Sequence, residues 1–128
     1  MTQECSPLAI DLTHLPYRTD AGTGARARIG AIVLATDHTI EAEWRAMLAI
    51  EGVAFFVARI WNDAQITPET LAALGGEIAP ATRLILPNDE RLDAVAFACT
   101  SGAMVLGEAF VAREVHRHRP GIAVTSPM

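Results

Sequence analysis

Four short apolar runs are spaced along the chain, and each has the length of a β-strand. They lie at residues 29–35, 53–58, 93–98 and 122–125. Continuous apolar runs of this kind are typical of strands that are covered on both faces of a sheet. Between the first two runs, apolar residues from Ile40 to Leu48 recur at intervals of three or four with charged residues between them. This spacing predicts an amphipathic helix over that segment.

Two more helical segments separate the remaining strands. Thr67-Pro68-Glu69 has the composition of a helix start, with a capping hydroxyl, a proline at the first position and an acid in the first turn. We expect Gly75-Gly76 and Pro80 to break or kink this helix, and residues 83–86 to form its last turn. A third long helix is predicted over residues 102–118.

The alternation of strands and helices predicts an α/β fold, with a parallel sheet of about four strands and helices on both faces. Residues 1–27 have mixed composition and are interpreted as an amino-terminal arm that could hold one short strand. Residues 28–128 form the α/β unit. The sequence stops directly after the fourth strand, where a crossover helix would normally follow. We therefore expect an under-covered sheet face, and a carboxy-terminal half or a partner chain to complete the unit.

Composition narrows the class of protein. The 128 residues are 51% hydrophobic and 20% charged, which predicts one globular domain with a real core. A net charge of −5 argues against nucleic acid or an anionic membrane surface as partner. No apolar run approaches the roughly 20 residues of a membrane span, and the amino terminus does not resemble a secretory signal. Cys5 and Cys99 show neither metal-site nor disulfide spacing, so a cytoplasmic location is expected.

The segment AFACTSGAM holds the main candidate site. Cys99 follows an apolar strand, and ligands of parallel sheets bind at the carboxyl ends of the strands. A helix beginning near Gly102 would offer unpaired N–H groups and a positive dipole end, which favours thiolate at Cys99. A carboxylate could then bind to main-chain donors and to the hydroxyls of Thr100 and Ser101. The alternative is a buried small cysteine beside an ordinary helix cap.

A second polar turn should open on the same edge of the sheet. Thr36-Asp37-His38-Thr39 follows the first strand, and its alternative interpretation is a capped turn without a site role. His116-Arg117-His118-Arg119 could form a metal or anion patch, but we expect a solvated helix end. Trp44 and Trp61 are interpreted as core and strand-end packing respectively.

Four segments together resemble the amino-terminal half of the aspartate/glutamate racemase superfamily. They are RIGAIVLATDHTIEAEWRAML, GVAFFVARI, ITPETLAAL and LDAVAFACTSGAMVLGEAF, and the resemblance covers roughly residues 28–126. The branch that they most resemble contains maleate cis-trans isomerase and arylmalonate decarboxylase. Within that branch, ATDHTIEAE and ACTSG look most like the racemase-like protein of ectoine utilisation.

The resemblance implies a cofactor-free enzyme of two similar α/β halves, each of which contributes one residue to the active site. Cys99 matches the first of the paired cysteines in racemases and isomerases, where decarboxylases carry glycine. Thr100 and Ser101 match the pair that binds the substrate carboxylate, followed here by Gly102. Asp37 stands where isomerases place a substrate-contacting asparagine, beside Thr36. A carboxylate at that position would repel a diacid unless it were protonated or paired.

These residues lead to an expected function and one alternative. The expectation is a cofactor-independent racemase, isomerase or decarboxylase-type domain acting on a small carboxylate, either an amino acid or a dicarboxylate. No cofactor and no metal are expected. The second cysteine and the substrate-covering tyrosine of the superfamily's other half have no counterpart here, because Cys5 and Tyr17 both lie in the arm. A homo-oligomer or a separate second half is therefore expected, and the alternative is a non-catalytic half-domain that binds a carboxylate or pairs with a partner.

Overall fold

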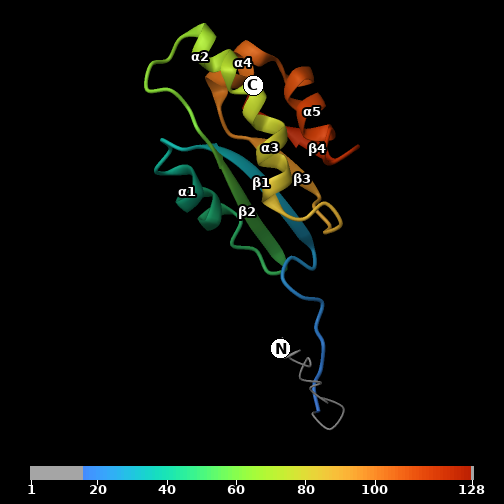
Figure 1. Cartoon of the computed structure of the whole chain (residues 1–128). Helices are drawn as coiled ribbons and strands as arrows, with labels where there is room; N and C mark the ends of the chain where they lie inside the picture. Colours follow the sequence, from blue (N-terminus) through green and yellow to red (C-terminus); the bar gives the residue numbers. More distant parts are fainter. Residues whose placement is uncertain (1–15, 128) are drawn as a thin grey trace, which may run out of the picture.

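The computed structural model describes residues 16–127 as one four-stranded sheet with five helices (Figure 1). The elements are β1 (Ala27–Leu34), α1 (Ile40–Met47), β2 (Val53–Ile60), α2 (Pro68–Ala73), α3 (Gly75–Ile85), β3 (Ala94–Phe97), α4 (Thr100–Leu106), α5 (Glu108–His116) and β4 (Ala123–Thr125). All strand pairs are parallel, in the order β2-β1-β3-β4. The predicted α/β fold is confirmed.

Helices lie on both faces of the sheet. Gly30 of β1 pairs with Phe56 of β2, and a Cβ atom at Gly30 would lie 2.9 Å from Ile85 of α3. Phe55 precedes Phe56, so its side chain points to the opposite face. There its ring meets Trp44 of α1, with the ring centroids 5.7 Å apart. In Figure 1, α1 stands on one side of β1 and β2, while α3, α4 and α5 gather on the other.

The hydrophobic core lies between the sheet and the layer formed by α3 and α5. Its largest fully buried apolar side chains are Ile32, Ile78, Val95, Phe97, Val111 and Val115. The face that carries α1 is covered much less. α1 contains no buried residue, and Ala123 and Thr125 of β4 are exposed. The sheet therefore has one complete face and one that is only partly covered.

Local chemistry explains where the helices begin and end. Thr67 caps α2 with its hydroxyl, as predicted, and the α2–α3 break falls at Leu74 beside the two glycines. Pro80 lies inside α3 and does not end it. The predicted continuous helix over residues 102–118 is wrong. Gly107 adopts a φ of 82°, which favours glycine and separates α4 from α5.

The predicted arm is only partly described. Residues 1–15, with Cys5, and Met128 lie outside the described residues. Residues 16–26 contain neither helix nor strand, and β1 begins one residue inside the predicted arm, at Ala27. The arm joins the sheet just before β1, where the N–H of Arg26 donates to the carbonyl of Gly52 at 2.8 Å.

Arg119 corrects the expectation of a wholly solvated helix end. Its side chain is 7% exposed, and its two terminal nitrogens donate to carbonyls after the end of α3. Those acceptors are the carbonyls of Leu86, Pro87, Asn88 and Glu90, at 2.6 to 3.3 Å. Arg117, in contrast, is exposed. Arg119 thus ties the chain after α5 to the loop that leads into β3.

The two tryptophans also differ from the expectation. Trp61 is 77% exposed, so the predicted strand-end packing is wrong. Trp44 contacts Phe55 but stays partly exposed, because α1 covers its face of the sheet without neighbouring helices.

Replacing Arg119 with alanine should lower the free energy of unfolding by about 2–4 kcal/mol, because the hydrogen bonds from its buried, charged guanidinium to four loop carbonyls are lost. Urea unfolding followed by circular dichroism measures this. The control is Arg117→Ala, which removes only a surface ion pair to Glu114 and should cost under about 1 kcal/mol. Equal losses in the two variants would contradict a structural role for Arg119.

Candidate functional site

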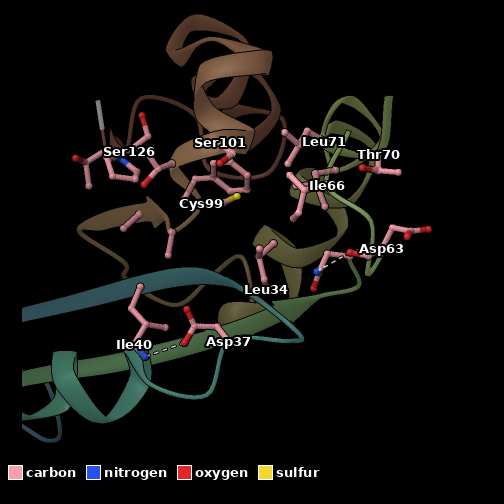
Figure 2. Close-up of a pocket in the computed structure, with 18 of the residues that line it drawn as sticks. Leu34, Asp37, Ile40, Asp63, Ile66, Thr70, Leu71, Cys99, Ser101 and Ser126 are labelled. Carbon is pink, nitrogen blue, oxygen red and sulfur yellow. Dashed lines mark hydrogen bonds between the residues drawn. The ribbon is translucent and has the colours of Figure 1, made fainter. Parts of the chain in front are cut away.

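A large pocket lies where all four strands end. Its volume is about 640 Å³, and residues that follow β1, β2, β3 and β4 contribute to its wall (Figure 2). Of the predicted site residues, Asp37, Cys99, Thr100 and Ser101 line it. Thr36 and Gly102 do not line the pocket. The parallel sheet therefore brings the two predicted turns to one cavity.

Cys99 lies in the pocket wall as the residue that caps α4. It is 8% exposed, has extended backbone geometry, and its Sγ accepts a hydrogen bond from the N–H of Gly102 at 3.2 Å. Because the N–H of Gly102 donates to the sulfur, it is not directed to the pocket. A Cβ atom at residue 102 would lie 3.1 Å from Sγ and 3.2 Å from Phe97, which explains a glycine there.

Thr100 and Ser101 provide further hydrogen-bond donors next to Cys99 in the chain. Both side chains are exposed and line the pocket. Within residues 16–127, the main-chain N–H groups of Thr100 and Ser101 have no hydrogen-bond acceptor. Two hydroxyls and two N–H groups at the start of a helix can together bind an anionic oxygen.

Asp37 combines a capping role with a place in the pocket. Its Oδ1 accepts hydrogen bonds from the N–H groups of Thr39 and Ile40, both at 2.8 Å, as in the capped-turn alternative. These bonds, that from Ile40 first, lower the pKa of the Asp37 carboxyl below its ordinary value. In Figure 2 the other carboxylate oxygen points up into the pocket, toward the side that holds Cys99. An ionised carboxylate thus faces the cavity at neutral pH.

Thr36 holds two strand ends together. Its N–H and hydroxyl donate to Oδ1 of Asn62 at 3.3 and 3.1 Å. Asn62 follows β2 and is 8% exposed, so the bonds fix the end of β1 against the end of β2. Thr36 therefore supports the pocket wall through Asn62 and does not line the pocket itself.

Part of the polar pocket wall lies outside the predicted site residues. Asn62 and Asp63 follow β2, Thr125 ends β4 and Ser126 follows it, and all four residues line the pocket. The signal was present, because the rule that places ligands at strand ends applies to every strand of a parallel sheet. Figure 2 shows Ser126 on the same side of the pocket as Ser101 and Cys99. A second pair of hydroxyl-bearing residues thus joins Thr100 and Ser101.

Much of the pocket wall is apolar, and its charged side chains are acidic. Ile66 and Leu71 are among its apolar residues, and Asp37 and Asp63 are its carboxylates. Over residues 16–127, no lysine, arginine or histidine lines the pocket. The same range holds no cluster of three or more histidine, cysteine or carboxylate side chains that could hold a metal ion. None of the helices between residues 16 and 127 combines the length and apolarity needed to cross a membrane.

Comparisons with protein-family models, with curated proteins and with solved structures found no match to this chain. The superfamily resemblance therefore rests on the quoted segments, and the function that it implies is a proposal. The fold and the pocket geometry stand independently of it.

Asp37→Ala should lower the free energy of unfolding by about 1 kcal/mol at pH 7, because α1 loses two capping hydrogen bonds. Asp37→Asn keeps the accepting oxygen and should cost less. Because folding lowers the pKa of Asp37, its contribution is complete above the ordinary value of 3.8 and is lost as the pH falls through the lower folded value.

Urea unfolding at pH 7 and at about pH 3 measures the Asp37→Ala effect above and below the ordinary pKa of 3.8. The exposed Asp89 has no hydrogen bond in the described part of the chain, so Asp89→Ala is the matched control. An Asp37→Ala loss that is the same at both pH values would contradict the role of the ionised carboxylate.

Proposed function

We propose that this chain supplies one wall of a cofactor-independent racemase or isomerase that acts on a small carboxylate. The observation that carries the proposal is Cys99, a nine-tenths buried thiol in a pocket wall, directly beside unpaired N–H groups and hydroxyls. A cytoplasmic location, where thiols stay reduced, accompanies this proposal. A decarboxylase reaction fits less well, because the decarboxylases that the chain resembles have glycine in place of this cysteine.

The proposed mechanism follows from where negative charge develops during the reaction. The Cys99 thiolate takes a proton from the carbon next to the substrate carboxylate, which forms an S–H bond and leaves a carbanion. The new negative charge spreads onto the carboxylate oxygens. The N–H groups and hydroxyls of Thr100 and Ser101 stabilise that charge, which is the most effective contribution that fixed donors can make. An acid on the opposite face returns a proton and inverts the carbon.

An isomerase would use the same groups differently. The thiolate adds to one carbon of a double bond beside the carboxylate, and a C–S bond forms while the charge moves to the carboxylate oxygens. Rotation about the resulting single bond and loss of the thiolate then give the other isomer. Both routes need a sulfur and an anion site side by side, as Cys99 and Thr100 are.

The opposite wall is proposed to come from a second polypeptide segment, either another copy of the chain or a separate half. The sheet face that carries α1 is partly open, and Ala123 and Thr125 on it are exposed. Among the described residues, the carboxyl of Asp37 is held ionised by its hydrogen bonds and is a poor proton donor. We therefore propose that an acid other than Asp37 returns the proton.

The same observation favours one alternative from another class of function. A chain with a carboxylate site but no opposing acid would bind a small acid without turning it over. That alternative is a carboxylate-binding half-domain whose activity depends on pairing with its partner.

Cys99→Ala should reduce α-proton exchange by at least about 100-fold, because the base is removed. The measurement is loss of the α-proton signal of L-aspartate or L-alanine in D₂O, followed by NMR, with conversion of maleate to fumarate assayed in parallel. Cys5→Ala is the matched control, because it removes the other thiol of the chain and leaves Cys99.

Two results would count against the cysteine mechanism. Unchanged turnover in folded Cys99→Ala protein would exclude Cys99 as base or nucleophile. Absence of turnover in every variant, together with protection of Cys99 from iodoacetamide by propionate, would favour the carboxylate-binding half-domain instead.

A further inference from the structure

The outer edge of β2 is a long edge of the sheet that no strand covers within residues 16–127. β2 is the terminal strand in the order β2-β1-β3-β4, and all eight of its residues pair with β1. The terminal strand on the other side, β4, has three residues. An exposed edge presents a row of unpaired N–H and C=O groups to which another strand can bind. β2 is therefore the edge where an added strand would form the most hydrogen bonds.

The direction of each backbone group of β2 follows from its pairing with β1. The carbonyls of Gly52 and Ile60 accept hydrogen bonds from the β1 side, at 3.2 and 2.8 Å. Backbone groups point to alternate sides along a strand, so those of Phe55, Val57 and Arg59 point away from β1. None of these three residues is buried. Their N–H and C=O groups are thus accessible along the outer edge.

The sequence of β2 does little to prevent another strand from pairing there. Proteins often protect a long edge strand with a proline, a lysine or a bulge. β2 reads VAFFVARI, without proline or lysine, and its register with β1 runs without interruption from Val53 to Ile60. Apolar Phe55 and Val57 are half-buried at this edge. The edge therefore combines accessible backbone groups with apolar side chains.

Two charged groups near the ends of β2 have capacity for a further partner. The Nε of Arg59 donates to Glu41 at 2.8 Å, and its Nη1 donates to carbonyls around the end of β1. Among the described residues, the Nη2 of Arg59 has no acceptor. The carboxylate of Glu51, in the turn before β2, likewise has no hydrogen bond or ion pair in this part of the chain, where only its main-chain carbonyl accepts from Arg26.

We propose that the outer edge of β2 is a self-association surface, on which β2 of a second copy of this chain pairs antiparallel about a two-fold axis at Phe55. A second copy fits because this register is self-complementary. It places Val53 opposite Val57, and Glu51 opposite Arg59, twice in the symmetric contact. The two Phe55 side chains meet at the axis and form a cross-strand aromatic pair.

This contact is separate from the missing wall of the pocket. Antiparallel pairing turns the carboxyl ends of the two sheets in opposite directions. The two pockets then lie at opposite edges of the joined sheet, and neither closes the other. The self-association surface therefore does not depend on the proposed catalytic function, and either proposal can fail without the other.

The first test measures the mass of the full chain by sedimentation equilibrium from about 1 to 100 µM, where a dimer should form. Val57→Pro removes one outward N–H and leaves the bonds to β1 intact, because proline is tolerated on the outer side of an edge strand. It should raise the dissociation constant of the dimer at least about tenfold. Circular dichroism checks that the variant is folded.

A charge exchange tests the register without changing the backbone. Glu51→Arg places like charges opposite each other twice per dimer and should raise the dissociation constant at least about tenfold at low salt. The double variant Glu51→Arg with Arg59→Glu restores opposite charges and should return the dissociation constant to within about threefold of the original. Arg83→Glu, on the exposed side of α3, is the control for a reversed charge and should leave the dissociation constant unchanged.

Each outcome supports or overturns the proposal. A chain that stays monomeric up to about 100 µM has no such surface, and the proposal fails. A dimer that Glu51→Arg does not weaken, or that the charge exchange does not restore, uses a different contact or register and also overturns it. Where Val57→Pro does not fold, the charge series alone decides.

Discussion

The position of β1 between β2 and β3 is the constraint on which the site depends. β1 pairs in parallel with both neighbours, so the chain leaves β1, β2 and β3 at the same edge of the sheet. β4 extends the parallel array from β3 and brings Ser126 to that edge. A parallel sheet needs a crossover after every strand, and each crossover begins with polar turn residues at this edge. The pocket forms where those turns meet.

Close packing against α3 holds β1 in this position. Gly30 leaves room for Ile85, and Ile32, Ile78 and Phe97 are fully buried on the same face. A side chain at residue 30 would push α3 away from the strand. That displacement would also affect Leu74 at the start of α3, which lines the pocket and lies close to Gly102. The core and the site wall are therefore parts of one packed unit.

The two faces of the sheet have different roles. The face under α3 and α5 is closed by a dense apolar layer, which supplies the rigidity that a preorganised anion site needs. The face that carries α1 leaves β4 exposed and places the charge of Asp37 beside the cavity. In the proposed function, the first face supplies stability and the anion site at the start of α4, and the missing wall belongs to the second face.

Much of the fold could be predicted, because the local pattern is strong where both faces of a strand are covered. The predicted apolar runs became β1 to β4, and Thr67 capped a helix as expected. The break at Gly107 was missed, because a glycine inside a helical pattern is tolerated unless the backbone takes a positive φ. Arg119 was misjudged, since the carbonyls that it contacts lie about 30 residues earlier and no local pattern connects them.

The candidate site, like the fold, was predicted only in part. The pattern of residues indicates that Cys99, Thr100 and Ser101 follow one strand and that Asp37 follows another, because strand ends are encoded locally by apolar runs and polar turns. The fold decides which of these strand ends share one cavity. It brings the turns after β1 and β3 to the same pocket, joins Thr36 to Asn62 by a hydrogen bond and adds Ser126 to the pocket wall. The reason is physical: hydrogen-bond partners and pocket walls are set by distances in space, which the order of residues along the chain does not specify.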